Sequence, residues 1–243
     1  DSLHAISRHY SPRFTMDDRL LYFGVGKREF EEPEDTLLDR EKVKLDLWHY
    51  AEDRLQPQQL LELKSDQTAS DLFVYHIANG SAVQIENDSL SVYPVNNLKG
   101  NKLLASSDKN YAFSYNWVSP RPEDFFTVDI ETGTIKTLLT NALFSPSLSP
   151  SGEHFAYFKD GNYYFANSET KESRCVTCDT TGIEWGSDMN GMPMEAYPSG
   201  GMFWNRDETI LYLQSEYDMW SYNRETGDFQ SFTHELGKLN NIQ

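Results

Sequence analysis

Four segments of the chain share one pattern: an opening Asp or Asn, alternating apolar residues, a short polar turn, and a second alternating run. They are DLFVYHIANGSAVQIE (71–86), DFFTVDIETGTIKTLLT (124–140), NYYFANSETKESRCVT (162–177) and DMWSYNRETGDFQSFT (218–233). Alternation with period two places every second side chain on one face of a strand, so each segment predicts an antiparallel β-hairpin. The repeat therefore restricts the chain to a series of similar β units.

The turns of these hairpins favour a backbone with positive φ. Three copies supply a glycine for it, in Asn79-Gly80, Thr132-Gly133 and Thr226-Gly227. The third copy has Thr170-Lys171 instead, so we expect its hairpin to be the least ideal of the four.

A second shared pattern precedes three of the hairpins: a short apolar strand, a polar turn, and a strand that ends in aromatic or aliphatic residues. The three copies are SPRFTMDDRLLYF (11–23), SPSLSPSGEHFAYF (145–158) and GGMFWNRDETILYL (200–213). In the second repeat, SLSVYPV, KLLASS and YAFSYNW provide these strands less clearly. Four antiparallel strands repeated about every 40 residues are typical of a β-propeller blade.

We therefore predict an all-β fold built from β-propeller-type blades of four antiparallel strands. The chain is expected to form one domain over 1–243, with about four blades that belong to a larger propeller. The blades are assigned to about 8–87, 90–140, 143–177 and 197–233, with insertions at 27–70 and 178–200. Within the first insertion, LDLWHYAEDRLQPQQLLELKSDQ (45–67) is expected to begin with an extra strand, followed by a helix from about 57 to 65. Long loops on a rigid β scaffold are common places for function.

The charge of the chain argues against two classes of partner. The sequence has 38 Asp and Glu against 21 Lys and Arg, a net charge of −17. Such a charge opposes binding to nucleic acid and to an anionic membrane surface. The negative charge is explained by solubility alone or by a cationic ligand. We find no apolar run of about 18 residues and no leader sequence, and the start at Asp1 suggests a trimmed or mature product.

The two cysteines, Cys175 and Cys178, form a single CVTC motif at the end of an expected strand. A zinc site needs four ligands, and neither a second pair nor a histidine lies at ligand spacing. Free thiols, a local disulfide and a redox-sensitive pair all remain open for this motif, and metal binding is the weakest alternative. We expect no metal and no cofactor.

Residues with catalytic chemistry are present without a catalytic pattern. No G-x-S-x-G elbow occurs, and Ser151 and Ser199 both lie at turns. Acidic pairs such as Asp17-Asp18, Glu31-Glu32 and Glu34-Asp35 follow from the acidic composition. The six histidines are scattered singly, at His4, His9, His49, His76, His154 and His234. We therefore assign no catalytic residue.

The loop 178–200 offers weak candidates for a binding site. It contains Trp185, Met192 and Tyr197, which can line a pocket or contact a peptide or protein partner. Packing against the sheets is the alternative for each, because methionine and aromatic side chains also fill gaps beneath loops. The methionines lack the His or Cys neighbours that a soft metal requires.

Several segments of the sequence resemble known proteins. SPSLSPSGEHFAYF and the hairpin segments are similar to the blade repeats of TolB-like propellers and of prolyl oligopeptidase family serine peptidases. FGVGK, LDLWHYAEDRLQPQQL, FVYHI and SPSLSPSG, in that order, resemble a secreted bacterial branch of that family, over about residues 11–233. The family's Ser-Asp-His triad lies in a C-terminal α/β-hydrolase domain, and no position of this chain matches it.

The resemblance implies a non-catalytic propeller that gates or positions peptide substrates for a C-terminal serine peptidase domain of the same protein. It also implies a periplasmic or extracellular location. Two other functions stay open: a free-standing TolB-like module that binds a protein through the loops 27–44 and 178–200, and an enzyme that uses loop carboxylates.

Overall fold

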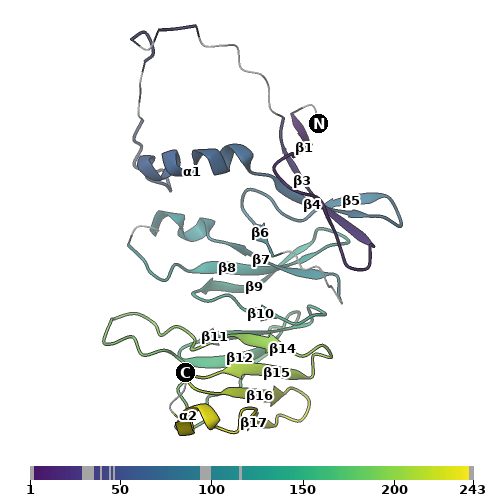
Figure 1. Ribbon diagram of the computed structural model, residues 1–243, viewed down its shortest axis with the longest axis vertical. Helices are drawn as coiled ribbons and strands as arrows, with labels where there is room; N and C mark the ends of the chain where they lie inside the picture. Colours follow the sequence, from purple (N-terminus) through teal and green to yellow (C-terminus); the bar gives the residue numbers. More distant parts are fainter. Residues whose placement is uncertain are drawn as a thin grey trace.

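The computed structural model describes residues 3–28, 36–38, 40–43, 45, 47–93, 100–114 and 117–240. Within these ranges the chain forms four antiparallel sheets that follow one another in chain order along the long axis (Figure 1). The prediction of an all-β fold built from small antiparallel sheets is therefore confirmed. Within the same ranges, no helix is both long enough and apolar enough to span a membrane.

The first two sheets occupy the N-terminal half. The first sheet has the order β1-β3-β4-β5, with β2 also paired to β3, and the second has the order β6-β7-β8-β9. Their strands are β1 His4–Ile6, β2 Arg13–Phe14, β3 Leu20–Lys27, β4 Asp71–His76, β5 Ser81–Gln84, β6 Ser91–Val92, β7 Lys102–Ser107, β8 Glu123–Asp129 and β9 Ile135–Ala142.

The last two sheets have four strands each, in the orders β10-β11-β12-β13 and β14-β15-β16-β17. Their strands are β10 Ser147–Leu148, β11 His154–Lys159, β12 Asn162–Asn167, β13 Ser173–Cys175, β14 Met202–Trp204, β15 Ile210–Gln214, β16 Met219–Asn223 and β17 Phe229–Ser231. In the second, third and fourth sheets each strand pairs with its neighbour in the sequence, so these sheets are simple meanders; in the first sheet β1 pairs with β3 instead of β2.

The four predicted hairpins are confirmed as β4–β5, β8–β9, β12–β13 and β16–β17. Their turns share one backbone conformation: φ is +72° at Gly80, +71° at Gly133 and +78° at Gly227. Lys171 adopts the same conformation with φ +61°, although only glycine reaches it without strain. The third turn thus keeps the repeat geometry with an unfavourable residue.

Two expected strands are absent from the described residues. LDLWHY forms no strand at residues 45 and 47–50; instead, the backbone turns where Glu52 N–H donates to the His49 carbonyl (3.2 Å). Residues 111–114, the described start of YAFSYNW, belong to a 3-10 helix, η1 (Lys109–Ser114), in which Asn110 and Tyr111 donate side-chain hydrogen bonds to Asp124. The expected helix near 57–65 is present as α1 (Gln56–Thr68), and a short α2 (Leu236–Asn240) follows the last sheet.

Apolar side chains fill the space between each pair of neighbouring sheets. The cluster between the first and second sheets contains Leu20, Tyr22, Leu72, Val74, Leu103 and Val128. The cluster between the second and third sheets contains Phe125, Leu138, Phe155 and Ala166. The cluster between the third and fourth sheets contains Phe158, Tyr163, Leu211, Leu213 and Tyr222. Full burial of one such side chain stabilises the fold by about 1.5–3 kcal/mol.

Polar contacts link the same pairs of sheets. His76 Nε2 lies 3.0 Å from the Ile130 carbonyl, between the first and second sheets. Glu169 in the β12–β13 turn receives Lys102 and Lys136 of the second sheet, each at 2.6 Å, and their hydrogen bonds lower the pKa of Glu169 to about 2. These contacts add polar links between the first and second sheets and between the second and third.

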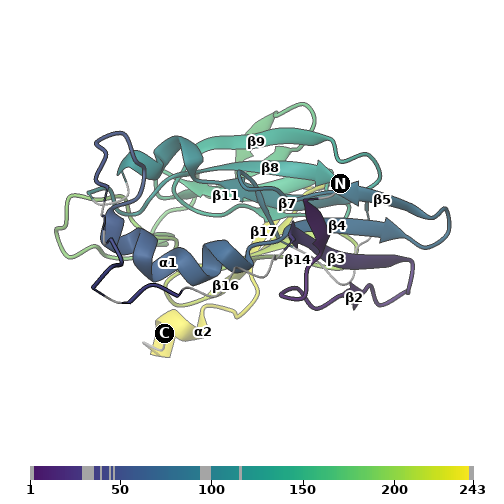
Figure 2. The same ribbon diagram turned by 90° about the horizontal axis from the view of Figure 1, so that it is seen from above.

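The third and fourth sheets are joined by a buried tyrosine. The Tyr163 hydroxyl donates to the Gly200 carbonyl (3.0 Å), and burial raises the pKa of Tyr163 to about 12. In Figure 1 the first and fourth sheets lie at opposite ends of the series, and the view from above in Figure 2 looks along the series, so that the sheets overlap. The four sheets therefore form an open arrangement.

Candidate functional site

Trp185, the first sequence candidate, belongs to the loop 178–200, but its side chain is buried in the core. Its side chain is only 4% exposed, and its indole N–H donates to Thr180 Oγ1 (2.8 Å). Its ring packs edge-on against Tyr163, Trp220 and Phe229, each with a centroid distance of 5.8 Å. One edge also lines a polar cleft of about 600 Å³ with Glu184, Asp188 and Glu216.

Tyr197 and Met192 do not line that cleft. Tyr197 packs edge-on against Phe144, with ring centroids 5.3 Å apart, and is 38% exposed. Met192 is 54% exposed and lies in a turn, where its backbone N–H donates to the Met189 carbonyl (3.0 Å). The structure therefore does not bring the three candidates together.

The CVTC motif forms a local disulfide between Cys175 and Cys178 at the end of β13. Of the alternatives for this motif, the structure shows the disulfide. Within the described ranges, no three His, Cys, Asp or Glu side chains are grouped closely enough to hold a metal ion.

Ser151 and His154 have side-chain partners, whereas the buried Oγ of Ser199 has no hydrogen-bond partner among the described residues. Ser151 Oγ donates to Glu208 (2.6 Å), and His154 Nε2 lies beside Arg224 Nη1 at 2.5 Å. Asp17 binds Thr15 and Arg19 within a turn, and these hydrogen bonds lower its pKa to about 2. The pairs Glu31-Glu32 and Glu34-Asp35 lie outside the described residues, as does part of the loop 27–44.

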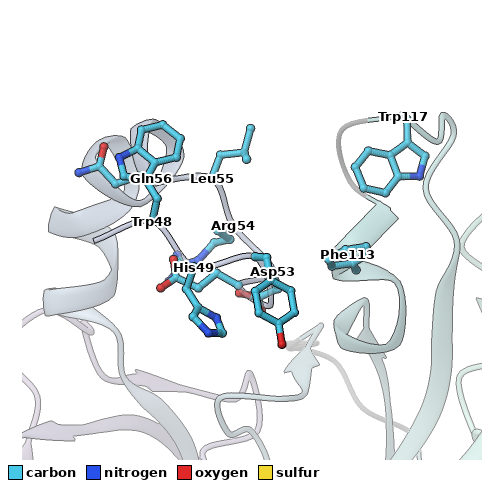
Figure 3. Close-up of a pocket in the computed structure, with 10 residues that line it drawn as sticks. Trp48, His49, Asp53, Arg54, Leu55, Gln56, Phe113 and Trp117 are labelled. Carbon is cyan, nitrogen blue, oxygen red and sulfur yellow. The ribbon is translucent and has the colours of Figure 1, made fainter. Parts of the chain in front are cut away.

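A different site lies between the segment that precedes α1 and the helix η1. It is an open cleft of about 300 Å³, which we call the aromatic cleft (Figure 3). It is lined by Trp48, His49, Tyr50, Glu52, Asp53, Arg54, Leu55, Gln56, Phe113 and Trp117. In Figure 3, Trp48 and Leu55 lie on one side, with His49 below them, and Phe113 and Trp117 lie on the other side.

Hydrogen bonds hold the first wall of the aromatic cleft against α1. Arg54 forms ion pairs with Glu62 at 2.8 Å and with Asp66 at 2.9 Å. The hydrogen bonds that Arg54 donates to Asp66 and Glu62 raise the pKa of Arg54. Those that Glu62 accepts from Gln58 and Arg54 lower the pKa of Glu62. The helix begins after Leu55 with a proline in its first turn, a favourable place for that residue. The wall is thus tied to a regular element.

The second wall is tied to the second sheet. Asp124 of β8 accepts hydrogen bonds from Tyr111 O–H (2.6 Å), Asn110 Nδ2 (2.7 Å) and Asn141 N–H (3.0 Å). Burial opposes the charge of this carboxylate, but the three hydrogen bonds outweigh it and lower the pKa of Asp124. They orient η1, at whose end Phe113 meets Trp117 edge-on at 5.6 Å.

Sequence reasoning missed the residues of the aromatic cleft. It placed the helix correctly but read LDLWHY and YAFSYNW as strands, which assigned their aromatic side chains to sheets. A usable signal was present for LDLWHY, which contains large aromatic residues in an insertion, where no repeat requires them.

Comparisons with known proteins show likeness in structure only. No model of a known protein family matches the chain, and no curated protein is similar to it in sequence. Solved structures are similar at low identity. A prolyl endopeptidase shares 9% identity, with a TM-score of 0.47, over 97% of this chain and 30% of its own. An acylaminoacyl peptidase in complex with a chloromethyl ketone shares 11%, with a TM-score of 0.41, over 95% and 32%.

A protein described as TolB from Agrobacterium tumefaciens is also similar, with 11% identity and a TM-score of 0.38, over 92% of this chain and 61% of its own. The chain therefore spans about a third of the length of the two peptidases. All of these TM-scores are below 0.5, and the fold is established by the strand pairing described above.

Proposed function

We propose that this chain is a non-catalytic part of a larger β-propeller that positions peptides, or limits their access, at a C-terminal α/β-hydrolase serine peptidase domain of the same protein. One observation carries the proposal: the sheets at both ends of the series have apolar outer faces. In a propeller, each such face packs against the next blade.

The outer face of the fourth sheet is aromatic. Register places Phe203 beside Tyr212, on the face opposite to Leu211 and Leu213. Phe232 packs edge-on against Tyr212 at 5.3 Å. Phe203 is 54% exposed and Phe232 57%, and exposed apolar patches of this kind mark interaction surfaces.

The outer face of the first sheet has the same character. Phe23 lies beside Phe73, with ring centroids 5.7 Å apart, and the next row joins Phe14, Leu21 and Tyr75. Phe14 is 56% exposed. Both ends of the series thus offer an apolar sheet face to a further blade.

We also propose a periplasmic or extracellular location. Disulfides persist in oxidising compartments and are rare in the cytosol, and Cys175–Cys178 supports such a compartment.

A free-standing TolB-like interaction module is the second candidate. The open aromatic cleft favours it, because a peptide of a protein partner can enter the cleft without any hydrolase domain.

The coding sequence after the Gln243 codon separates the two candidates. An in-frame G-x-S-x-G motif followed by Asp and His supports the peptidase, and a stop codon directly after Gln243 refutes it. In the peptidase case, the whole protein should hydrolyse short peptides faster than folded proteins, and changing the elbow serine to alanine should abolish hydrolysis.

The outer faces can be tested on the chain itself. We expect Phe203→Ser with Phe232→Ser to reduce the binding of a fluorescent apolar dye. Met192→Ser is a matched control, because it removes a similarly exposed apolar side chain elsewhere (54%). Equal dye binding by the double variant and the control would contradict the role given to the end faces.

A further inference from the structure

The aromatic cleft carries an excess of negative charge. Glu52 and Asp53 belong to its lining, and the guanidinium of Arg54 is already engaged by Glu62 and Asp66 on α1. The aromatic cleft and its first wall thus have four carboxylates and one guanidinium, and two of the carboxylates pair with that guanidinium. The carboxylate that is least committed is that of Asp53, for which the described residues provide no ion-pair partner within 4.0 Å.

The walls of the aromatic cleft are rings that the fold does not bury. Trp48 is 67% exposed and Trp117 66%, in contrast to 4% for Trp185 in the core. Phe113 is 60% exposed and packs against Trp117, which leaves much of both rings open to solvent. Exposed indole faces next to carboxylates attract organic cations, because the ring quadrupole and the carboxylate charge act in the same direction.

The same chain shows this recognition elsewhere, within its own fold. The guanidinium of Arg174 lies over the rings of Phe165 at 5.2 Å and Tyr222 at 5.1 Å. Its Nη2 donates to the Arg224 carbonyl (2.7 Å). The groups that hold the Arg174 guanidinium are two aromatic rings and an oxygen acceptor. Groups of both kinds are also present in the aromatic cleft.

We propose that the aromatic cleft binds an arginine side chain presented by an extended peptide. Its guanidinium would stack on the indole of Trp48 or Trp117 and donate hydrogen bonds to the carboxylate of Asp53. Arginine fits better than lysine, because its planar group stacks on rings and pairs with a carboxylate through two bonds. A volume of about 300 Å³ is at the lower end for small-ligand pockets and suits a single side chain.

This proposal goes beyond the proposed function, because it names a ligand and needs no hydrolase domain. It is tested by direct binding to the chain, without any turnover. Failure of the binding test would leave the peptidase proposal standing, and absence of a hydrolase domain would leave the arginine site standing.

The test is a titration of the ¹⁵N-labelled protein with the peptide acetyl-Ala-Arg-Ala-amide, followed through the indole N–H signals. The blocked ends leave the arginine side chain as the sole charge of the probe. We expect saturable shifts for the indoles of Trp48 and Trp117, assigned with single Trp→Phe variants, and none for Trp185. Acetyl-Ala-Gln-Ala-amide should bind at least about fivefold more weakly, and the lysine peptide should fall between them.

Variants locate the charge contribution. Asp53→Asn keeps the size of the side chain and should weaken binding of the arginine peptide about two- to fivefold, as should Trp117→Ala. Asp188→Asn, in the loop 178–200, makes the same charge change away from the aromatic cleft and should leave binding unchanged. Circular dichroism checks that each variant folds, and 0.5 M NaCl should weaken binding of the arginine peptide. Equal affinities for the arginine and glutamine peptides, or equal effects of Asp53→Asn and Asp188→Asn, would overturn the proposal.

Discussion

Replacing Gly227 with alanine tests the cost of the repeated turn conformation alone. Gly227 has φ +78°, and its N–H donates to the Asn223 carbonyl (2.8 Å) to close the turn. A Cβ atom built there would meet no atom within 4 Å, so no clash adds to the backbone term. The left-handed conformation costs a residue with a Cβ about 1–2 kcal/mol. We therefore expect Gly227→Ala to lower the free energy of unfolding by about 1 kcal/mol.

Gly133 provides the comparison with a clash. Its φ is nearly the same, but an added Cβ would lie 3.1 Å from the Gln84 carbonyl oxygen and 3.2 Å from Val83 Cγ1 of the first sheet. We expect Gly133→Ala to cost more than Gly227→Ala, because the neighbouring sheet must also move. Lys171→Gly should have the opposite sign and stabilise the protein by about 0.5 kcal/mol, since strain is removed and a side-chain contact with the Ser168 carbonyl is lost.

Urea unfolding at 25 °C measures all three variants, and a shared slope shows that they unfold in the same way. For a domain of this size, 1 kcal/mol corresponds to about 2–4 °C in Tm. The reasoning is refuted if Gly133→Ala costs less than Gly227→Ala, or if Lys171→Gly destabilises by as much as Gly227→Ala.

Two further predictions concern buried polar contacts. Burial and the nearby charge of Arg224 lower the pKa of His154, so the unfolded chain binds this proton more readily. The free energy of unfolding should therefore decline as the pH falls below about 6.5, the ordinary pKa of histidine. The His154→Gln variant should show a smaller decline between pH 7 and pH 5, which would support His154 as the source. Trp185→Phe removes the indole N–H that donates to Thr180 and should lower the free energy of unfolding in urea by about 1–2 kcal/mol. Trp117→Phe, at an exposed position, should change it by less than about 0.5 kcal/mol. Equal losses for the two tryptophan variants would contradict the core position of Trp185.

The hairpins could be predicted from the sequence because their determinants are local. Period-two alternation fixes which side chains face a core, and Gly80, Gly133 and Gly227 mark turns that need positive φ. The third hairpin was also predicted, with the least ideal turn, and the structure shows that Lys171 takes the same conformation without being a glycine. The repeat therefore outweighs the preference of a single residue.

The segments that were misread depend on partners far away in the sequence. YAFSYNW alternates well enough for a strand, but the Asp124 carboxylate, on β8, draws Asn110 and Tyr111 into η1. LDLWHY alternates as well, but within the described residues no adjacent strand offers it hydrogen bonds. A strand forms when a neighbour supplies its ladder, and alternation within one segment cannot reveal whether that neighbour exists.

The same limit explains why the aromatic cleft could not be predicted from the sequence. Trp48 lies in an insertion of the first repeat and Trp117 in the second, so only the packing of two sheets brings their walls together. Each wall is held by carboxylates that the sequence presents as ordinary acidic residues: Glu62 and Asp66 bind Arg54, and Asp124 binds η1. Part of the acidic excess thus positions aromatic rings beside Asp53. For that part, the acidic residues have a structural role, and the arginine peptide tests the cationic-ligand explanation of the net charge directly.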